Sequence, residues 1–270
     1  MKIMIKKANK RVLSETRQLL KNKGVRDAKG LFVVEGLKIV KDISLTACVF
    51  DFVLLSSAFA RKVSNENLLL KLKKNGVCLY SVEDDAFRKI SSLRTPQGIL
   101  AVVKKNENKL RVLCKKDVLV LVCDGIQDPG NLGTIIRSAA AFGVDSVILT
   151  GESADIYNPK VIRASSGAIF DVPIHYCGAD FLDAFRRNGY KVIVSTLGAE
   201  NTTEISEIKK NASSFVLVFG NEGRGVSPEI KSKADMFFHI PIKRRVESLN
   251  VTAAVAVTLY EFKRGLMVKN

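Results

Sequence analysis

Several residue types on which common protein functions depend are scarce in this 270-residue chain. It has no tryptophan, only two histidines (His175 and His239) and no HExxH pattern, so a histidine base or a histidine-rich metal site is disfavoured. Its five cysteines are scattered and form no CxxC pair, which argues against a disulfide framework or a zinc site. We therefore expect no bound metal.

Long apolar runs are also missing from the sequence. No run approaches the roughly 18 residues that a membrane-spanning helix needs, and no apolar segment of a secretory signal follows the basic N-terminus. These absences predict a cytoplasmic protein without membrane contacts. With 47% hydrophobic and 26% charged residues, the chain can bury a globular core, and its length favours two domains.

The positive charge of the chain is concentrated in its first part. Residues 1–116 contain 26 Lys and Arg against 10 Asp and Glu, whereas residues 117–270 contain 17 of each. An excess of one sign over a whole segment favours binding to an anionic polymer over simple solvation of a surface. No basic helix with a Trp or Phe face for a membrane surface is evident, so nucleic acid is the expected partner, held through its phosphates.

The two parts of the chain also differ in their pattern of apolar residues. Residues 1–103 mix short strands and helices, and the polar residues 104–116 are expected to be a linker. After residue 117, continuous apolar runs alternate with helical stretches, which indicates a parallel sheet covered on both faces and an α/β fold. Helices are expected at 9–22 (stopped by Gly24), 37–43 and 249–263, and strands at 31–34, 49–55, 77–80, 99–103, 118–122, 146–149, 192–194, 215–219 and 236–240.

Three loops after expected strands are rich in glycine, asparagine and charge, and α/β domains bind ligands beyond the carboxyl ends of their strands. They are DGIQDPGNLGTIIR at 124–137, GNEGRG at 220–225 and PIKRRVESLNVT at 241–252. The glycines at 220–225 are spaced GxxGxG, which is not the dinucleotide fingerprint, and no GxxxxGK[ST] occurs. A nicotinamide enzyme and a P-loop nucleotidase are therefore poor fits.

These three blocks, in this order, resemble the SpoU (TrmH) branch of the SPOUT RNA methyltransferases over the whole of residues 117–270. The combination of DPGNLGTIIRSAAAFG, GNEG and SLNVTAAVA carries the resemblance. The stretch GLFVVEGLKIV resembles, more loosely, the ribosomal-protein-like substrate-binding domain that precedes the catalytic domain in members acting on ribosomal RNA. The expected domains are thus an RNA-binding domain at 1–103, a linker at 104–116 and a catalytic domain at 117–270.

The resemblance implies 2′-O-methylation of ribose in RNA with S-adenosylmethionine as methyl donor, and ribosomal RNA as the substrate because of the extra domain. It further implies a parallel sheet whose carboxyl end is threaded into a deep trefoil knot, a cofactor pocket formed by the last three loops, and a homodimer. Methyl transfer needs little acid–base chemistry once donor and acceptor are aligned, so a site without histidine can perform it.

The family motifs also imply roles for individual residues. The residues expected at the reaction centre are Asn131, Arg137, Glu222 and Asn250; those expected around the cofactor are Thr196, Leu197, Gly198, Gly220, Ile240, Ile242 and Leu249; and those expected to hold RNA phosphate are Lys243, Arg244 and Arg245. Arg137 would either take the 2′-hydroxyl proton or, since a guanidinium normally stays charged, orient the hydroxyl through the neighbouring phosphate.

Simpler explanations remain open for single residues, and other functions remain open for the whole chain. Arg137 could be a surface arginine of a helix, Glu222 an exposed loop carboxylate, and Ser248 and Asn250 caps of the last helix. The alternative functions are a tRNA ribose methyltransferase of the same family, a base methyltransferase, and a non-catalytic RNA-binding or ribosome assembly factor of the same fold. The intact motif blocks argue against the last of these.

Overall fold

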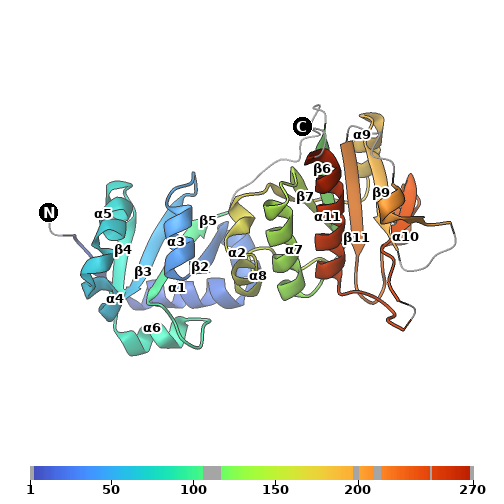
Figure 1. Cartoon of the computed structure of the whole chain (residues 1–270). Coiled ribbons are helices and arrows are strands. Elements are labelled where there is room, and N and C mark those ends of the chain that lie inside the picture. Colours follow the sequence, from blue (N-terminus) through green and yellow to red (C-terminus); the bar gives the residue numbers. More distant parts are fainter. Residues whose placement is uncertain (1–2, 106–116, 197–200, 209–213, 244, 268–270) are drawn as a thin grey trace. The chain divides into compact units, whose positions relative to one another are not determined.

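The computed structural model describes residues 3–105, 117–196, 201–208, 214–243 and 245–267. These residues form two compact units, each with its own sheet (Figure 1). The first unit contains residues 3–105 together with Tyr157–Arg163, and the second contains residues 117–156 and the described residues from Ala164 onward. No helix among the described residues is long and apolar enough to cross a membrane.

The sheet of the first unit has five strands in the order β1-β4-β3-β5-β2. The strands β1, β4 and β3 run parallel, whereas β5 is antiparallel to both of its neighbours. The strands are β1 (Lys6–Lys7), β2 (Leu31–Glu35), β3 (Phe50–Ser56), β4 (Cys78–Val82) and β5 (Ile99–Lys104), and the helices are α1 (Lys10–Lys21), α2 (Lys23–Lys29), α3 (Leu37–Ile43), α4 (Ser57–Arg61), α5 (Glu66–Lys74), α6 (Asp84–Ile90) and α8 (Pro159–Ala164).

The first two helices differ from the single helix expected at 9–22. Asn9 caps α1, since its Oδ1 accepts a hydrogen bond of 3.0 Å from the Val12 N–H. Asn22 adopts an extended conformation and caps a second helix, accepting from the Val25 N–H at 3.3 Å. Gly24 therefore lies inside α2 and does not end a helix; the left-handed Gly30 does so.

A short segment from the second half of the sequence belongs to the first unit. The Tyr157 ring lies 4.5 Å from that of Phe32, and Lys105 Nζ lies 4.8 Å from the centre of the Tyr157 ring. Arg163 Nη1 donates to Ser92 Oγ at 2.8 Å. The expected catalytic domain at 117–270 includes this segment, so the compact units and the expected domains do not have the same boundaries. That the boundaries at 103 and 117 separate two functions stays a prediction.

The sheet of the second unit has seven strands in the order β10-β12-β9-β11-β6-β7-β8, and every neighbouring pair is parallel. The expected parallel α/β architecture is thereby confirmed. The strands are β6 (Val118–Asp124), β7 (Ser146–Thr150), β8 (Ile174–Tyr176), β9 (Lys191–Ser195), β10 (Thr203–Glu204), β11 (Ser214–Gly220) and β12 (Met236–His239), and the helices are α7 (Pro129–Ala141), α9 (Phe181–Arg187), α10 (Pro228–Lys231) and α11 (Val251–Met267).

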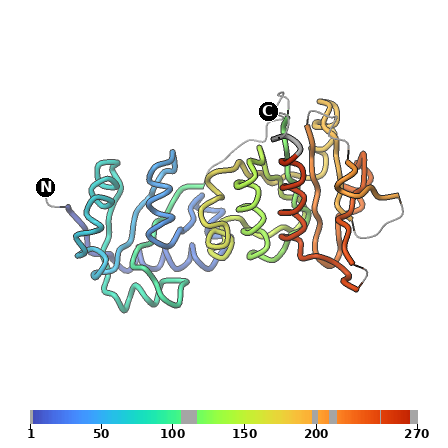
Figure 2. The backbone as a smooth tube through the Cα atoms, in the orientation of Figure 1, coloured from blue at the N-terminus to red at the C-terminus, as the bar shows by residue number. Residues whose placement is uncertain are grey.

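Helices cover both faces of this sheet. On one face Phe185 of α9 and Ile230 of α10 share a buried cluster with the valines of β6 and β11. On the other face α11 packs beside α7 (Figure 2). The Phe262 ring of α11 lies 5.3 Å from that of Phe215. The last strand, β12, lies between β9 and β10, and the chain then returns to α7 as α11. The second sheet is thus buried between two helical layers, as its continuous apolar strands predict.

Candidate active site at the carboxyl edge of the parallel sheet

The loops that follow β6, β7 and β11 start at the same level of the sheet. The strand register pairs Asp124 with both Gly220 and Thr150. The Asp124 carboxylate is buried and links all three loops: Oδ1 accepts from Thr150 Oγ1 at 2.7 Å and Oδ2 accepts from the Ser227 N–H at 2.7 Å. These hydrogen bonds compensate the cost of burying a charge. They also fix the loops after β6, β7 and β11 relative to one another.

The GNEGRG loop after β11 is held by its asparagine. The backbone groups of Asn221 and Gly225 bond each other in both directions, at 3.0 and 2.8 Å. The side chain of Asn221 accepts from the N–H groups of Gly223 and Arg224 through Oδ1 and donates through Nδ2 to Gly125 O at 2.9 Å. The loop is therefore a closed turn tied to the loop after β6.

The glycines of this loop serve different purposes. Gly225 has φ +68°, the left-handed region that glycine adopts without strain. Gly220 does not have a positive φ, but a Cβ added there would lie 2.2 Å from Gly225 C and 2.3 Å from Val226 N. The turn leaves no room for a side chain at Gly220, so this glycine is required by the loop itself.

The first two motif blocks meet at the start of α7. Asp128 caps this helix, accepting from the Asn131 N–H at 2.8 Å. The Asn131 side chain donates through Nδ2 to Glu222 Oε1 at 2.5 Å, and Glu222 is exposed. A carboxylate beside the N-terminus of a helix is stabilised by the helix dipole. The structure thus brings together two of the four residues expected at the reaction centre, across 91 positions of sequence.

Arg137, the third of these residues, is differently placed. It lies six residues after Asn131 on α7, which is about 9 Å along the helix axis. Its side chain is exposed and makes no hydrogen bond or ion pair with any residue that the structure describes. The buried face of α7 is formed by Leu132, Ile135 and Ile136. The guanidinium is therefore available to a ligand, although no contact places it beside Glu222.

Asn250, the fourth, precedes α11. Its Oδ1 accepts from the Thr252 N–H at 2.8 Å and from Thr252 Oγ1 at 2.6 Å, and its carbonyl accepts from the N–H groups of Ala253 and Ala254. With these bonds Asn250 caps the start of α11, which is the simpler explanation considered for this residue above. They engage the side-chain oxygen, whereas no bond within the described residues engages its Nδ2 donor.

Comparison with known proteins decides the family. Residues 118–260 match the model of the SpoU rRNA Methylase family, and residues 11–101 match that of the MRM3-like substrate binding domain. The chain belongs to the SpoU rRNA methylase family. Among SpoU-type relatives, it is 33% identical to the 23S rRNA (guanosine(2553)-2′-O)-methyltransferase RlmP of Bacillus subtilis, over 90% of this chain and 93% of that protein. It is 27% identical to the mitochondrial rRNA methyltransferase 3 of Mus musculus, over 96% of this chain and 73% of that protein.

Solved structures agree with this family. The AdoMet-bound rRNA methyltransferase from Sinorhizobium meliloti superposes with a TM-score of 0.86 at 26% identity, covering 97% of each chain. The SpoU methyltransferase AviRb from Streptomyces viridochromogenes, in complex with AdoMet, gives a TM-score of 0.82 at 26% identity, covering 96% of this chain and 100% of AviRb. The SpoU family and the fold class predicted from the motif blocks are confirmed; the roles of single residues stay predictions.

Three of the residues expected around the cofactor of this SpoU-family chain, Thr196, Gly220 and Ile240, lie at or directly after the carboxyl ends of strands of this sheet. Thr196 follows β9 and donates its N–H to Phe238 O at 2.9 Å, which places it beside the end of β12, directly before Ile240. Leu249 is half-buried, whereas Ile242 is exposed. Two of the expected residues, Leu197 and Gly198, lie outside the described residues, as does Arg244 of the expected phosphate-binding group.

Lys243 and Arg245, the other members of that group, are exposed and form no hydrogen bond or ion pair through their side chains within the described part of the chain.

Two residues that the sequence analysis missed, Asp124 and Asn221, organise the loops on which the site depends. The only signal for Asp124 was its position directly after a buried apolar run.

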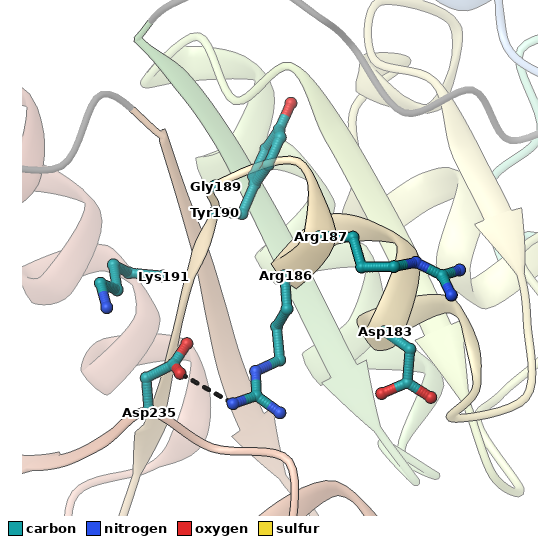
Figure 3. Close-up of a pocket in the computed structure, with 7 residues that line it drawn as sticks. All are labelled: Asp183, Arg186, Arg187, Gly189, Tyr190, Lys191 and Asp235. Carbon is teal, nitrogen blue, oxygen red and sulfur yellow. Dashed lines mark hydrogen bonds and ion pairs between the residues drawn. The ribbon is translucent and has the colours of Figure 1, made fainter.

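The site of this SpoU-family chain is distinct from a hollow at the opposite, amino edge of the sheet. Figure 3 shows Arg186 pointing to Asp235, with 3.2 Å between Arg186 Nη2 and Asp235 Oδ1. Asp235 also accepts from the Val192 N–H at 2.9 Å and so fixes the start of β9. The hollow is lined by Asp183, Arg186, Arg187, Gly189, Tyr190, Lys191 and Asp235. None of the residues that line this hollow belongs to the motif blocks.

Proposed function

We propose that this protein transfers a methyl group from S-adenosylmethionine to the 2′-hydroxyl of a ribose in ribosomal RNA. The observation that carries the proposal is the hydrogen bond between Asn131 and Glu222, which joins the first and second motif blocks at the carboxyl edge of the sheet. Family membership, the AdoMet-bound relatives and the match to a substrate binding domain support the same function.

The late loops fit an organic cofactor with an apolar part. Ile242 and Val246 are 37% and 51% exposed in the loop between β12 and α11, so apolar surface is available there for a ligand to cover. Thr196, Gly220, Ile240, Ile242 and Leu249 are the described residues that would hold S-adenosylmethionine, which supplies a methyl group on a positively charged sulfur. Gly220 would act on the cofactor through the closed turn that its missing side chain permits.

The residues at the start of α7 would hold the RNA. Because the Asn131 amide donates to Glu222, the orientation of this amide is fixed and its Oδ1 remains as an acceptor for a hydroxyl or for a guanidinium. Arg137 would bind the phosphate beside the target ribose and orient the 2′-oxygen toward the methyl donor. Since a guanidinium keeps its proton near neutral pH, the proton of the 2′-hydroxyl would be released to water.

We further propose a homodimer formed through α11, with the deep trefoil knot of the family. Ala253, Val257 and Tyr260 are exposed at helical spacing on α11, and Val257 and Tyr260 are 44% and 56% exposed. The Tyr260 ring lies 6.5 Å from that of Phe142, which extends this apolar stripe. The insertion of β12 between β9 and β10 before the chain returns to α7 supports a knotted path.

A methyl-transfer assay on separated RNAs tests the function. The full chain is incubated with radiolabelled S-adenosylmethionine and with ribosomal or transfer RNA, and the labelled nucleotide is mapped. We expect label in ribosomal RNA at a phosphodiester that resists alkali, which marks ribose methylation. Label only in transfer RNA, or at an alkali-sensitive position, would contradict the proposal, and no cofactor binding in calorimetry would favour an assembly factor. We also propose a cytoplasmic location, which the resemblance to a 23S rRNA methyltransferase of Bacillus subtilis supports.

A further inference from the structure

The outer face of α1 carries several cations and no acid. Lys10, Arg17 and Lys21 are spaced by seven and four residues, so they fall within a narrow arc of the helix. All three are exposed, and so is Arg11 beside them. The opposite face of α1 is buried on the sheet through Val12, Thr16 and Leu19. We call Lys10, Arg11, Arg17 and Lys21 the basic stripe.

The acids nearest in sequence are engaged elsewhere. Glu15, the only acid of α1, forms an ion pair with Lys29. Asp27 of α2 accepts from Lys105 Nζ at 2.5 Å, and this hydrogen bond lowers the pKa of the Asp27 carboxyl. The four cations of the basic stripe make no hydrogen bond or ion pair through their side chains within the described residues. Their charge is therefore not neutralised by this chain.

Three other cations near α1, namely Arg26, Lys29 and Lys105, have partners within the first unit. Arg26 is 3% exposed, and its Nη1 donates to Leu19 O at 2.7 Å, which fastens α2 to α1. Lys29 and Lys105 have the acid partners described above. The basic residues of this region thus divide into a set used inside the unit and a set exposed toward solvent without partners.

Building on the proposed function, we propose that the basic stripe of α1 is a docking surface for the phosphate backbone of the substrate RNA. From Lys10 to Lys21 the helix rises about 16 Å, which is long enough for contact with several consecutive phosphates. The exposed positions between the cations are Ser14 and Gln18, which carry no charge. No aromatic residue lies on α1, so the surface suits the backbone and offers no ring on which a base could stack.

Removal of the stripe charges, compared with removal of equal charge elsewhere in the same unit, tests this surface. The stripe variant combines Lys10→Gln, Arg17→Gln and Lys21→Gln. The control variant combines Lys38→Gln, Lys41→Gln and Lys74→Gln on α3 and α5, two helices that contribute nothing to the apolar cluster beneath α1. All six positions are exposed, so both variants should keep the wild-type circular dichroism and Tm.

Affinity for a transcript of large-subunit ribosomal RNA is measured over a range of salt, without S-adenosylmethionine. For the stripe variant we expect the slope of log affinity against log salt to fall by about 2 to 3. At about 0.1 M salt its Kd should rise tenfold or more. For the control we expect less than a threefold change in Kd. An equal loss of affinity in both variants would show that only net charge matters. An unchanged Kd in the stripe variant would show that RNA does not bind to the basic stripe. Either result overturns the proposal.

Methylation by the same variants separates this proposal from the proposed function. In single-turnover assays the stripe variant should need more RNA for half-maximal rate while keeping the wild-type rate at saturation. If the wild-type chain binds the transcript through the stripe but methylates no ribose, the proposed function fails and the docking surface stands. If the wild-type chain methylates RNA and the stripe variant does so at the same RNA concentrations, the docking surface fails and the function stands.

Discussion

Arg137 and Asn131 lie on the same helix but differ in their relation to the rest of the chain. Because Arg137 has no partner among the described residues, Arg137→Ala removes no internal contact and should leave Tm within about 2 °C of the wild type. If Arg137 orients the ribose, the single-turnover rate should fall by about 100-fold or more, with cofactor affinity unchanged in calorimetry. Arg137→Lys distinguishes charge from the planar fork. A wild-type rate in Arg137→Ala would make this residue an ordinary surface arginine.

The Asn131–Glu222 bond can be tested through its two ends. Glu222→Gln keeps an acceptor for the Asn131 amide, so it should reduce the methylation rate less than Glu222→Ala, by about 10-fold against 100-fold. In a double-mutant cycle of Glu222→Ala with Asn131→Ala the losses should be clearly non-additive, because either alanine alone already breaks the bond. Additive losses would show that the two side chains act independently.

Cys123 precedes the buried Asp124 and gives a pH-dependent test of the carboxyl end of β6. Burial raises the pKa of the Cys123 thiol to about 12, and the charge of Asp124 acts in the same direction. Since the native thiol resists deprotonation and the unfolded one does not, native stability should decline as the pH rises above about 9. At pH 8, maleimide should modify the exposed Cys78 and spare Cys123 in peptide mapping. Equal modification of both thiols would mean that the strand end opens to solvent.

At the scale of elements, the GNEGRG turn can be tested by a pair of glycine substitutions. Gly220→Ala places a Cβ 2.2 Å from the backbone of Gly225, so the turn must deform. We expect cofactor affinity to fall about tenfold or more and the free energy of unfolding to fall by about 1–3 kcal/mol. Gly223→Ala is the matched control, because a Cβ added at Gly223 would lie 3.5 Å from Asn221 Oδ1, which is an ordinary van der Waals contact. Equal effects of the two substitutions would contradict this account of the loop.

The sequence predicts the elements with strong local signals and misses those that depend on distant pairing. Local patterns of apolar residues predict the strands β6 and β11 and the bounds of α3, because the residues that these elements bury lie close together in the sequence. The two-residue strands β1 and β10 carry no such signal and exist only through their neighbours. In the site, motif blocks point to Asn131 and Glu222, but the linking role of Asp124 depends on Ser227, 103 positions away, and local patterns do not contain that contact.

At the scale of the whole molecule, the apolar stripe of α11 should govern the oligomeric state. Tyr260→Glu places a charge in the centre of the proposed interface and should convert a dimer to a monomer in sedimentation equilibrium at micromolar concentrations. Lys191→Gln changes the net charge by the same amount at an exposed position on the amino edge of the sheet and should leave the mass unchanged. A wild-type chain that sediments as a monomer would contradict the proposed homodimer.

The segment Tyr157–Arg163 constrains how this protein can be recombined with its relatives. Because the segment lies in the first unit while its sequence neighbours lie in the second, the chain passes between the two units three times. A chimera spliced only within 104–116 would pair one parent's first unit with the other parent's segment. Phe32 would then meet a foreign residue at position 157, and Ser92 a foreign residue at 163. A transfer of the complete first unit from one relative to another therefore requires two grafts taken from the same parent.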